Sequence, residues 1–388
     1  MKLLVLLPRV PYPLEKGDKL RAFYQIKELS KYHDIYLIAL QDTPLHDEAL
    51  EKIKSYCKEV YLFKLSWFSK CWGITRAFFK GLPMQCGYFY SSKAKRKIEK
   101  LINKIHPDHI YCFMIRMAEY VKHHKHHKTL DYQDVLSIGM KRRSEKAPFW
   151  KKPIFLYEYQ ALKRYEKNIF HHFTNKIIIT NIDRDLIHHP HRQYIQVIPN
   201  GIDFERFAHI KKEKVHDLIF AGNMSYPPNI DAALFLVKSI FPKLLAKFPD
   251  LKLCICGANP APTIKALASE NITVTGWVDE MAEYYAQSKI FIAPMHLGTG
   301  LQNKLLEAMA MKLPCVTSPL AGKPLEGALH HNDLLICNNV NDYVEATSKL
   351  LNDEDFYHTI AENGYQFVKT NYDWEEIGKK LEEIVNED

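Results

Sequence analysis

The sequence predicts an α/β protein with two doubly wound, Rossmann-like domains, each built on a parallel sheet covered by helices. Short apolar strands, such as residues 2–7 and 290–293, alternate with helices that carry one apolar stripe. This alternation begins again at residues 216–222. The two halves also differ in charge, because residues 1–200 contain 36 Lys and Arg against 19 Asp and Glu, and the remainder contains 17 against 26. We therefore expect two domains with different partners.

The first domain is expected over residues 1–200, together with a helix that returns at residues 371–388. A buried strand leads into a proline-rich loop, after which Asp18 is a favoured N-cap for a helix over residues 19–31. Further strands are expected at residues 34–40, 59–64, 109–114, 128–132 and 176–180. This order implies right-handed crossovers between parallel strands.

The second domain is expected over residues 201–370, with a long helix at about residues 229–248. Ligands bind at the C-terminal ends of strands in open α/β sheets. The loops assigned to such ends bear glycines, which let a ligand approach the backbone closely. These glycines are Gly222, Gly257, Gly276, Gly298 with Gly300, and Gly322.

Composition favours a cytoplasmic location, with a peripheral position at the inner face of the membrane left open. No stretch approaches the ~20 apolar residues needed to span a bilayer. The N-terminal MKLLVLLP lacks a small-residue cleavage site and is interpreted as the first strand rather than a signal peptide. The eight cysteines form no C-x-x-C pair, and several lie in apolar runs, which indicates a reducing compartment.

Residues 65–97 interrupt the alternation with aromatic and basic side chains and contain no acidic residue. This mixture suits an anionic membrane surface, nucleic acid, or a helical pair whose aromatic residues are core, and all three interpretations stay open at this point. The run HHKHH at residues 123–127 is expected to be a solvated turn or helix end, because the interspersed lysine would repel a metal cation.

Residues 290–317 predict a buried strand, a loop with two glycines, a helix and a second buried strand. The first turn of a helix has unpaired N–H groups and the positive end of the helix dipole, which suits an anion. Lys304 and Glu307 share one face of this otherwise apolar helix. They form either a structural salt bridge or part of a site for a nucleoside diphosphate, in which the carboxylate would accept hydrogen bonds from ribose hydroxyls.

Several common motifs are absent from the sequence. It has no G-x-G-x-x-G after a first strand, no G-x-x-x-x-G-K-[ST] and no G-x-S-x-G. A dinucleotide oxidoreductase, a P-loop NTPase and an α/β-hydrolase therefore lose their main support.

Four stretches carry a resemblance that covers almost the whole chain. They are PYPLEKGDKLR (residues 11–21), VIPNGID (197–203), FAGNMSYPPNIDAALFLVKSIFP (220–242) and GTGLQNKLLEAMAMKLPCV (298–316). On these stretches the chain resembles a retaining group 1 glycosyltransferase (glycosyltransferase family 4) of the GT-B fold, in which two Rossmann-like domains face each other across a cleft. The similarity is greatest to a subgroup associated with surface polysaccharides.

The resemblance implies a role for particular residues. Glu307 would bind the donor ribose, and the diphosphate would lie at the helix start formed by Gly300, Leu301, Gln302 and Asn303, with Lys304 adding charge. Gly17 would close over the same phosphates from the first domain, and the loops at Gly222 and Gly257 and at Trp277–Val278 would approach the donor, the last two holding its base. Asp18 would orient the acceptor hydroxyl or act as a base.

Two positions depart from the family pattern. Thr299 stands where the first acid of the E-x7-E motif would contact the transferred sugar, and Asn223 replaces a basic residue that often follows the first donor-domain strand. The expected activity is that of a hexosyltransferase that uses a nucleotide-sugar donor and a glycan or lipid-linked acceptor, with no cofactor, no metal and no nucleic acid. The basic first half would face an anionic membrane. A nucleotide-sugar 2-epimerase and a non-catalytic binding protein with a basic face remain alternatives.

Overall fold

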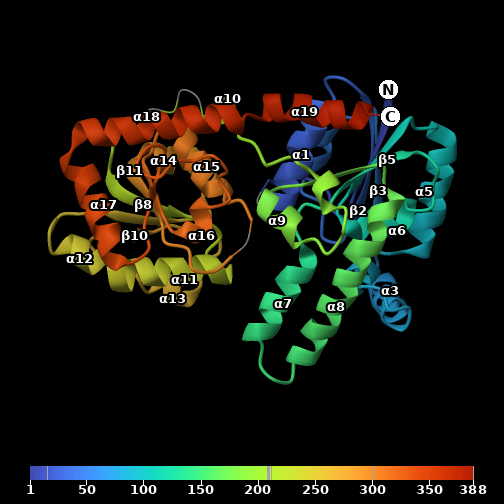
Figure 1. Ribbon diagram of the computed structural model, residues 1–388, viewed down its shortest axis with the longest axis horizontal. Helices are drawn as coiled ribbons and strands as arrows, with labels where there is room; N and C mark the ends of the chain where they lie inside the picture. Colours follow the sequence, from blue (N-terminus) through green and yellow to red (C-terminus); the bar gives the residue numbers. More distant parts are fainter. Residues whose placement is uncertain (15, 208–209, 211, 299, 388) are drawn as a thin grey trace. The chain divides into compact units, whose positions relative to one another are not determined.

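Met1–Pro199 and Trp374–Asp388 form one unit around a seven-stranded parallel sheet, and Asn200–Asp373 form a second unit around a six-stranded one (Figure 1). The computed structural model describes residues 1–14, 16–207, 210, 212–298 and 300–387. Strand pairs in both sheets are parallel, so the predicted α/β class with two doubly wound sheets is confirmed.

The sheet of unit 1 has the strand order β3-β2-β1-β4-β5-β6-β7. Its strands are β1 Lys2–Leu7, β2 Asp34–Gln41, β3 Glu59–Lys64, β4 His109–Phe113, β5 His127–Asp131, β6 Asn175–Ile178 and β7 Gln196–Val197. Its helices are α1 Gly17–Leu29, α2 Ala49–Lys54, α3 Trp67–Phe79, α4 Met84–Tyr88, α5 Ser92–Ile105, α6 Ala118–Val121, α7 Leu136–Lys146, α8 Lys152–Ile169, α9 Asn181–Leu186 and α19 Trp374–Asn386. Short 3-10 turns lie at Ile115–Met117, Phe170–His172 and Arg192–Tyr194.

Each face of this sheet has its own hydrophobic core, because successive strand residues point to opposite faces. In β1, Leu4 and Leu6 belong to the core under α5 and α8, whereas Leu3 and Val5 belong to the core under α1 and α19. Helix α19 comes from the C-terminal end of the chain and packs against α1. Its Trp374 ring stacks on Tyr24, with 5.3 Å between the ring centroids.

The sheet of unit 2 has the strand order β10-β9-β8-β11-β12-β13. Its strands are β8 His216–Ala221, β9 Leu253–Cys256, β10 Ile272–Val274, β11 Ser288–Ala293, β12 Cys315–Thr317 and β13 Leu335–Ile336. Its helices are α10 Phe204–Phe207, α11 Pro227–Phe235, α12 Phe241–Leu245, α13 Pro262–Lys265, α14 Met281–Ala286, α15 Asn303–Ala310, α16 Pro319–Gly322, α17 Val340–Asn352 and α18 Glu354–Asn371. The chain order reverses between the neighbouring strands β8 and β11, which makes this the switch point of the sheet.

The structure differs from the predicted elements in two places that matter below. The single helix expected at residues 229–248 is divided by a π-helical turn at Leu236–Ile240, just before Pro242, which has no N–H for a regular helix. Helix α1 has Lys16 as its N-cap, with Asp18 inside the first turn, so the prediction of Asp18 as the cap was wrong by two positions. A carboxylate in the first turn is still favoured by the helix dipole.

Candidate active site

The switch point of the unit 2 sheet brings together the loops that follow β8 and β11. Gly222 and Asn223 follow β8, and Gly298 and Gly300 lie between β11 and α15. Gly300 has a φ of 68°, a backbone conformation that favours glycine. In open α/β sheets, ligands bind in the crevice outside the strand ends at such a point.

Gly222 and Gly257 allow the backbones of the loops after β8 and β9 to come into direct contact. A Cβ on Gly257 would lie 1.9 Å from the carbonyl oxygen of Gly222, and a Cβ on Gly222 would lie 2.6 Å from the Asn229 side-chain nitrogen. Gly257 also has a φ of 140°. Side chains larger than glycine are therefore excluded from both positions unless the loops move apart.

Lys304, in the first turn of α15, extends to the end of β8. Its ammonium donates to Oδ1 of Asn229 at 2.6 Å and lies 5.0 Å from the centroid of the Phe220 ring. The residue as a whole is partly buried, but its charged end is enclosed by these neighbours and by Met295. Burial lowers the pKa of Lys304 to about 7, and the nearby Glu307 carboxylate opposes this shift.

Glu307 lies one turn further along α15 and is also partly buried. Its Oε2 accepts a hydrogen bond from the Tyr285 hydroxyl at 3.0 Å. Burial raises the pKa of Glu307, against the opposing effects of this hydrogen bond and of the Arg206 and Lys304 charges. Within the described residues, Glu307 and Lys304 do not form an ion pair, because each side chain is held by a different neutral partner.

The start of α15 is shaped by amide side chains. Gln302 is the N-cap residue and makes no side-chain capping hydrogen bond, but its Nε2 donates to the carbonyl of Gly300 at 3.4 Å. Oδ1 of Asn303 accepts from Nδ2 of Asn200 at 3.1 Å. Leu301 packs against the core of the unit. The N–H groups of this first turn have no intrahelical acceptor and can bind an anion.

The remaining predicted donor residues lie around the same edge of the sheet. Trp277, in the loop after β10, is 60% exposed, whereas Val278 beside it packs against the core. Oδ1 of Asn223 accepts hydrogen bonds from both the backbone N–H and the hydroxyl of Ser225, and these bonds stabilise the loop after β8. Thr299 lies outside the described residues.

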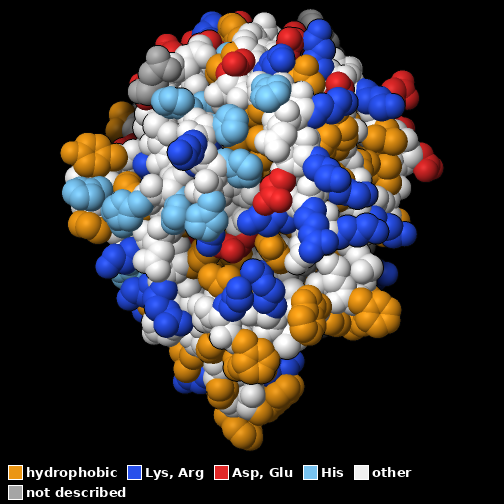
Figure 2. Space-filling view, turned by 90° about the vertical axis from the view of Figure 1, so that its right-hand side faces the viewer, with side chains coloured by type: hydrophobic (Ala, Val, Ile, Leu, Met, Phe, Trp, Pro, Cys, Tyr) orange, Lys and Arg blue, Asp and Glu red, His pale blue; other side chains and the backbone are white. Residues whose placement is uncertain are grey.

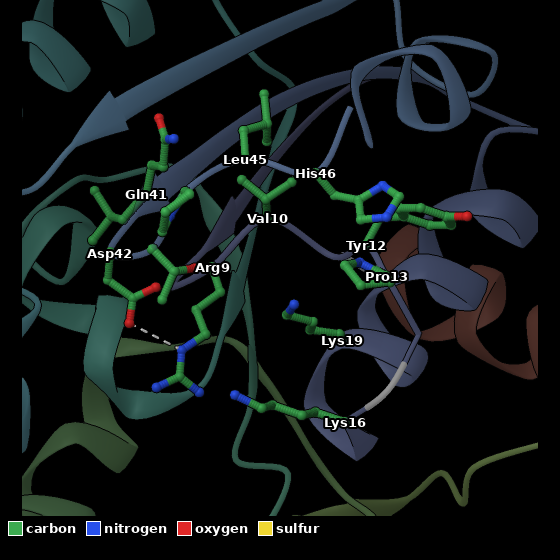
Figure 3. A pocket seen from close by; sticks show the side chains of 13 residues that line it. Arg9, Val10, Tyr12, Pro13, Lys16, Lys19, Gln41, Asp42, Leu45 and His46 are labelled. Atoms are coloured by element: carbon green, nitrogen blue, oxygen red, sulfur yellow. Dashed lines mark hydrogen bonds and ion pairs between the residues drawn. The ribbon is translucent and has the colours of Figure 1, made fainter. Parts of the chain in front are cut away.

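Unit 1 contains a pocket of about 380 Å³ at the ends of β1 and β2 (Figure 3). Lys16 and Lys19 extend from the start of α1 toward the side of the pocket that Arg9 occupies, and Tyr12 and His46 lie opposite. The pocket is lined by Arg9, Val10, Tyr12, Pro13, Lys16, Lys19, Leu40, Gln41, Asp42, Thr43, Pro44, Leu45 and His46.

Asp18 lies beside this pocket and is held by Arg9. The Arg9 guanidinium contacts Asp18 at 3.1 Å through Nη1 and Asp42 at 3.2 Å through Nε. Burial opposes the charge of Arg9, but the two carboxylates outweigh it and raise the pKa of Arg9. Gly17 precedes Asp18, and a Cβ at Gly17 would have no described atom within 4 Å.

The described residues contain neither a metal-binding cluster nor a membrane-spanning helix. There, no group of three or more His, Cys, Asp or Glu side chains is arranged to hold a metal ion, and this includes the HHKHH run. Among the same residues, no helix is long and apolar enough to cross a bilayer.

A family model and two curated relatives match the sequence. Residues 215–353 match the family described as glycosyl transferases group 1. An uncharacterised 44.6 kDa protein in the cps region of Klebsiella pneumoniae is 23% identical over 401 residues, which cover 97% of both chains. The capsular polysaccharide biosynthesis glycosyltransferase CapM of Staphylococcus aureus is 24% identical over 206 residues, which cover 48% of this chain and 53% of CapM.

Solved structures share the fold over the whole length. HepE of Anabaena, crystallised with UDP and glucose, aligns with a TM-score of 0.67 at 13% identity, over 98% of both chains. A UDP-N-acetylglucosamine 2-epimerase aligns with a TM-score of 0.56 at 12% identity, over 98% of this chain and 94% of that one.

The two parallel sheets give the chain the α/β fold of GT-B glycosyltransferases. The match of residues 215–353 to the group 1 glycosyltransferases agrees with the resemblance recognised from the sequence, whereas membership in family 4 stays a prediction. Sequence reasoning missed Asn229 and Tyr285, the hydrogen-bond partners of Lys304 and Glu307. Asn229 lies within a family-like stretch and could have been noted there, but Tyr285 reaches the site only through the packing of α14 on the sheet.

Proposed function

We propose that this protein transfers a hexose from a nucleoside-diphosphate sugar to a glycan or lipid-linked acceptor in the synthesis of a cell-surface polysaccharide, with retention of the anomeric configuration. The observation that carries this proposal is the arrangement of Lys304 and Glu307 on the first turns of α15, at the switch point of the unit 2 sheet. The capsule-associated relatives support the process.

The donor fits this site group by group. The diphosphate would lie against the N–H groups of Asn303 and Lys304 and the Lys304 ammonium, and the ribose hydroxyls would donate to Glu307. As the bond to the sugar breaks, negative charge grows on the leaving diphosphate. Preorganised N–H groups and a cation stabilise that charge, which is our reason for proposing that the reaction needs no metal. Trp277 offers an exposed aromatic face to the base.

The acceptor would bind to unit 1, in the pocket beside Arg9. Its basic lining suits an acceptor that carries a negative group, such as a lipid-linked glycan at the cytoplasmic face of an anionic membrane. Asp18 would orient the acceptor hydroxyl, and its ion pair with Arg9 fixes the carboxylate for this role. The role predicted for Gly17 toward the donor phosphates stays a prediction.

Replacement of Glu307 tests the donor site. We expect Glu307→Ala to reduce kcat/KM at least about a hundredfold, because a hydrogen bond to a charged group contributes about 1.5–3 kcal/mol and two would be lost. Glu362→Ala, which removes an exposed carboxylate of the same unit, serves as the matched control. A Glu307→Ala protein with wild-type transfer activity would refute the assignment.

Two alternatives are separated by their products. A 2-epimerase, favoured only by its shared fold, would convert a nucleotide sugar to its epimer without any acceptor. A non-catalytic binding protein would bind nucleoside diphosphates without turnover, or bind DNA in a salt-dependent way through its basic half. A thermal-shift panel of nucleoside diphosphates and their sugars, followed by product analysis with the stabilising donor, distinguishes all three.

A further inference from the structure

Helix α3 buries its small residues and exposes its large apolar ones. The residues that it packs against α4 are the small Gly73 and Ala77, and a Cβ on Gly73 would lie 2.1 Å from the carbonyl oxygen of Gly87. Its large side chains point the other way. Four of them are between 71% and 84% exposed: Trp67, Phe68, Trp72 and Phe79. The core interpretation of these residues is therefore wrong, although Phe89, further along the same segment, is buried.

A second exposed aromatic set lies at the tip of a helical hairpin. Helices α7 and α8 run side by side away from the sheet of unit 1 (Figure 1). Near their connection, Phe149 is 87% exposed and Trp150 is 60% exposed. The ammonium of Lys151 lies 4.5 Å from the Trp150 ring centroid. These residues lie outside the aromatic and basic stretch at residues 65–97.

The two aromatic sets belong to one surface, which we call the aromatic end of unit 1. Helix α3 is joined to α8 where the Tyr157 hydroxyl donates to the carbonyl of Phe78 at 3.1 Å, with 4.9 Å between the two ring centroids. The Glu158 carboxylate then accepts from the backbone N–H groups of Met84 and Gln85, at 2.8 and 3.0 Å. These bonds fix the start of α4 on α8, and with it α3.

Positive charge predominates around the aromatic end, where Glu145 near the end of α7 is an exposed acidic residue. Residues 64–97 contain eight Lys and Arg and no acidic residue. The carboxylates of Glu158 and Glu166 on α8 are buried and engaged with backbone and side-chain donors, so they do not offset this charge at the surface. Figure 2 shows lysine and arginine side chains directly above exposed hydrophobic ones at the lower end of this face.

We propose that the aromatic end is a membrane-docking surface that inserts its Trp and Phe side chains into the headgroup region of an anionic bilayer. Aromatic rings favour that depth, and lysines next to them gain energy from anionic lipid. A second copy of the chain is a poorer partner, because two such basic surfaces would repel each other. The inference goes beyond glycosyl transfer and does not depend on it.

Vesicle binding by the full chain tests this surface. The protein is sedimented with vesicles of equal parts phosphatidylglycerol and phosphatidylcholine, and with phosphatidylcholine alone. Two double variants remove aromatic residues from α3 (Trp72→Ser with Phe79→Ser) and from the hairpin tip (Phe149→Ser with Trp150→Ser). Tyr194→Ser, which changes an equally exposed aromatic residue elsewhere on unit 1, is the matched control.

We expect each double variant to lower the partition coefficient on anionic vesicles about tenfold and the control to leave it unchanged. Neutral vesicles should bind the wild type about tenfold more weakly. Acyl-chain-brominated lipid should quench the fluorescence of the wild type more than that of the hairpin-tip variant. Unchanged circular dichroism and Tm would show that the variants are folded.

Three results would overturn the proposal. One is vesicle binding that neither double variant changes. Another is an absence of binding to anionic vesicles by the wild type. The third is a wild-type dimer in sedimentation velocity that the same substitutions dissociate, which would assign the surface to a second copy of the chain.

Discussion

Nucleoside-diphosphate binding is predicted to make the protein take up a proton at Lys304. Burial lowers the pKa of this lysine to about 7 in the unliganded protein. At pH 8, about nine tenths of the Lys304 side chains would therefore be neutral before binding. A diphosphate in contact with the ammonium would raise the pKa by about 2–3 units, since opposite charges at close range favour the charged form.

The expected uptake at pH 8 is about 0.8–0.9 of a proton per bound ligand, and at pH 7 it is about half a proton. Isothermal titration calorimetry of the stabilising nucleoside diphosphate, in buffers with different ionisation enthalpies, measures this number directly. At pH 8 the phosphates of the ligand are already ionised, because their last pKa is about 6. The measured protons therefore belong to the protein.

Two variants locate the proton. Lys304→Met should bind the nucleotide more weakly and take up none, and Lys304→Arg should bind without uptake, because a guanidinium stays charged at this pH. An observed heat that is independent of the buffer in the wild type would refute the reasoning. Equal uptake in Lys304→Met would refute it as well, because the proton would then go to another group.

Two further predictions concern stability. Gly257→Ala should lower the free energy of unfolding by about 2–4 kcal/mol, because its Cβ would lie 1.9 Å from the Gly222 carbonyl oxygen. Gly276→Ala should leave the free energy of unfolding unchanged, because a Cβ there would have no atom within 4 Å. Equal denaturation midpoints for the two variants would contradict this. The pKa of His109 is lowered to about 4, chiefly by burial. Between its ordinary value near 6.5 and 4, the unfolded chain binds a proton that the folded chain does not. The free energy of unfolding should therefore decrease by up to about 3 kcal/mol as the pH is lowered from about 6.5 to 4. Denaturant titrations of His109→Gln over the same pH range should lack this decrease.

The fold could be predicted because its signals are local. A continuous apolar run such as residues 290–293 indicates a strand that is buried on both faces. The alternation of strands and helices begins again near His216, which separates the two sheets. The errors came where tertiary packing decides. The aromatic residues of α3 have the composition of a core, and only the close contact between Gly73 and Gly87 shows which side of the helix faces inward.

The candidate site could be predicted only in part for the same reason. The helix start, Lys304 and Glu307 lie within one short stretch of sequence. Their partners come from elsewhere, since Asn229 follows β8 and Tyr285 lies on α14. Which strand ends meet is set by the strand order, with β8 beside β11, and a sequence pattern does not contain that order.

The two interpretations of Lys304 and Glu307 left open by the sequence make opposite statements about pKa. In a structural salt bridge each charge stabilises the other, so the pKa of the lysine would rise and that of the carboxyl would fall. Both shifts go the other way here, because burial outweighs the mutual attraction and favours the neutral form of each group. Each side chain instead keeps one neutral hydrogen-bond partner and retains capacity for more. A ligand that brings negative charge to the lysine and hydroxyl donors to the carboxylate would relieve both penalties at once, and a nucleoside diphosphate carries the two groups on one molecule.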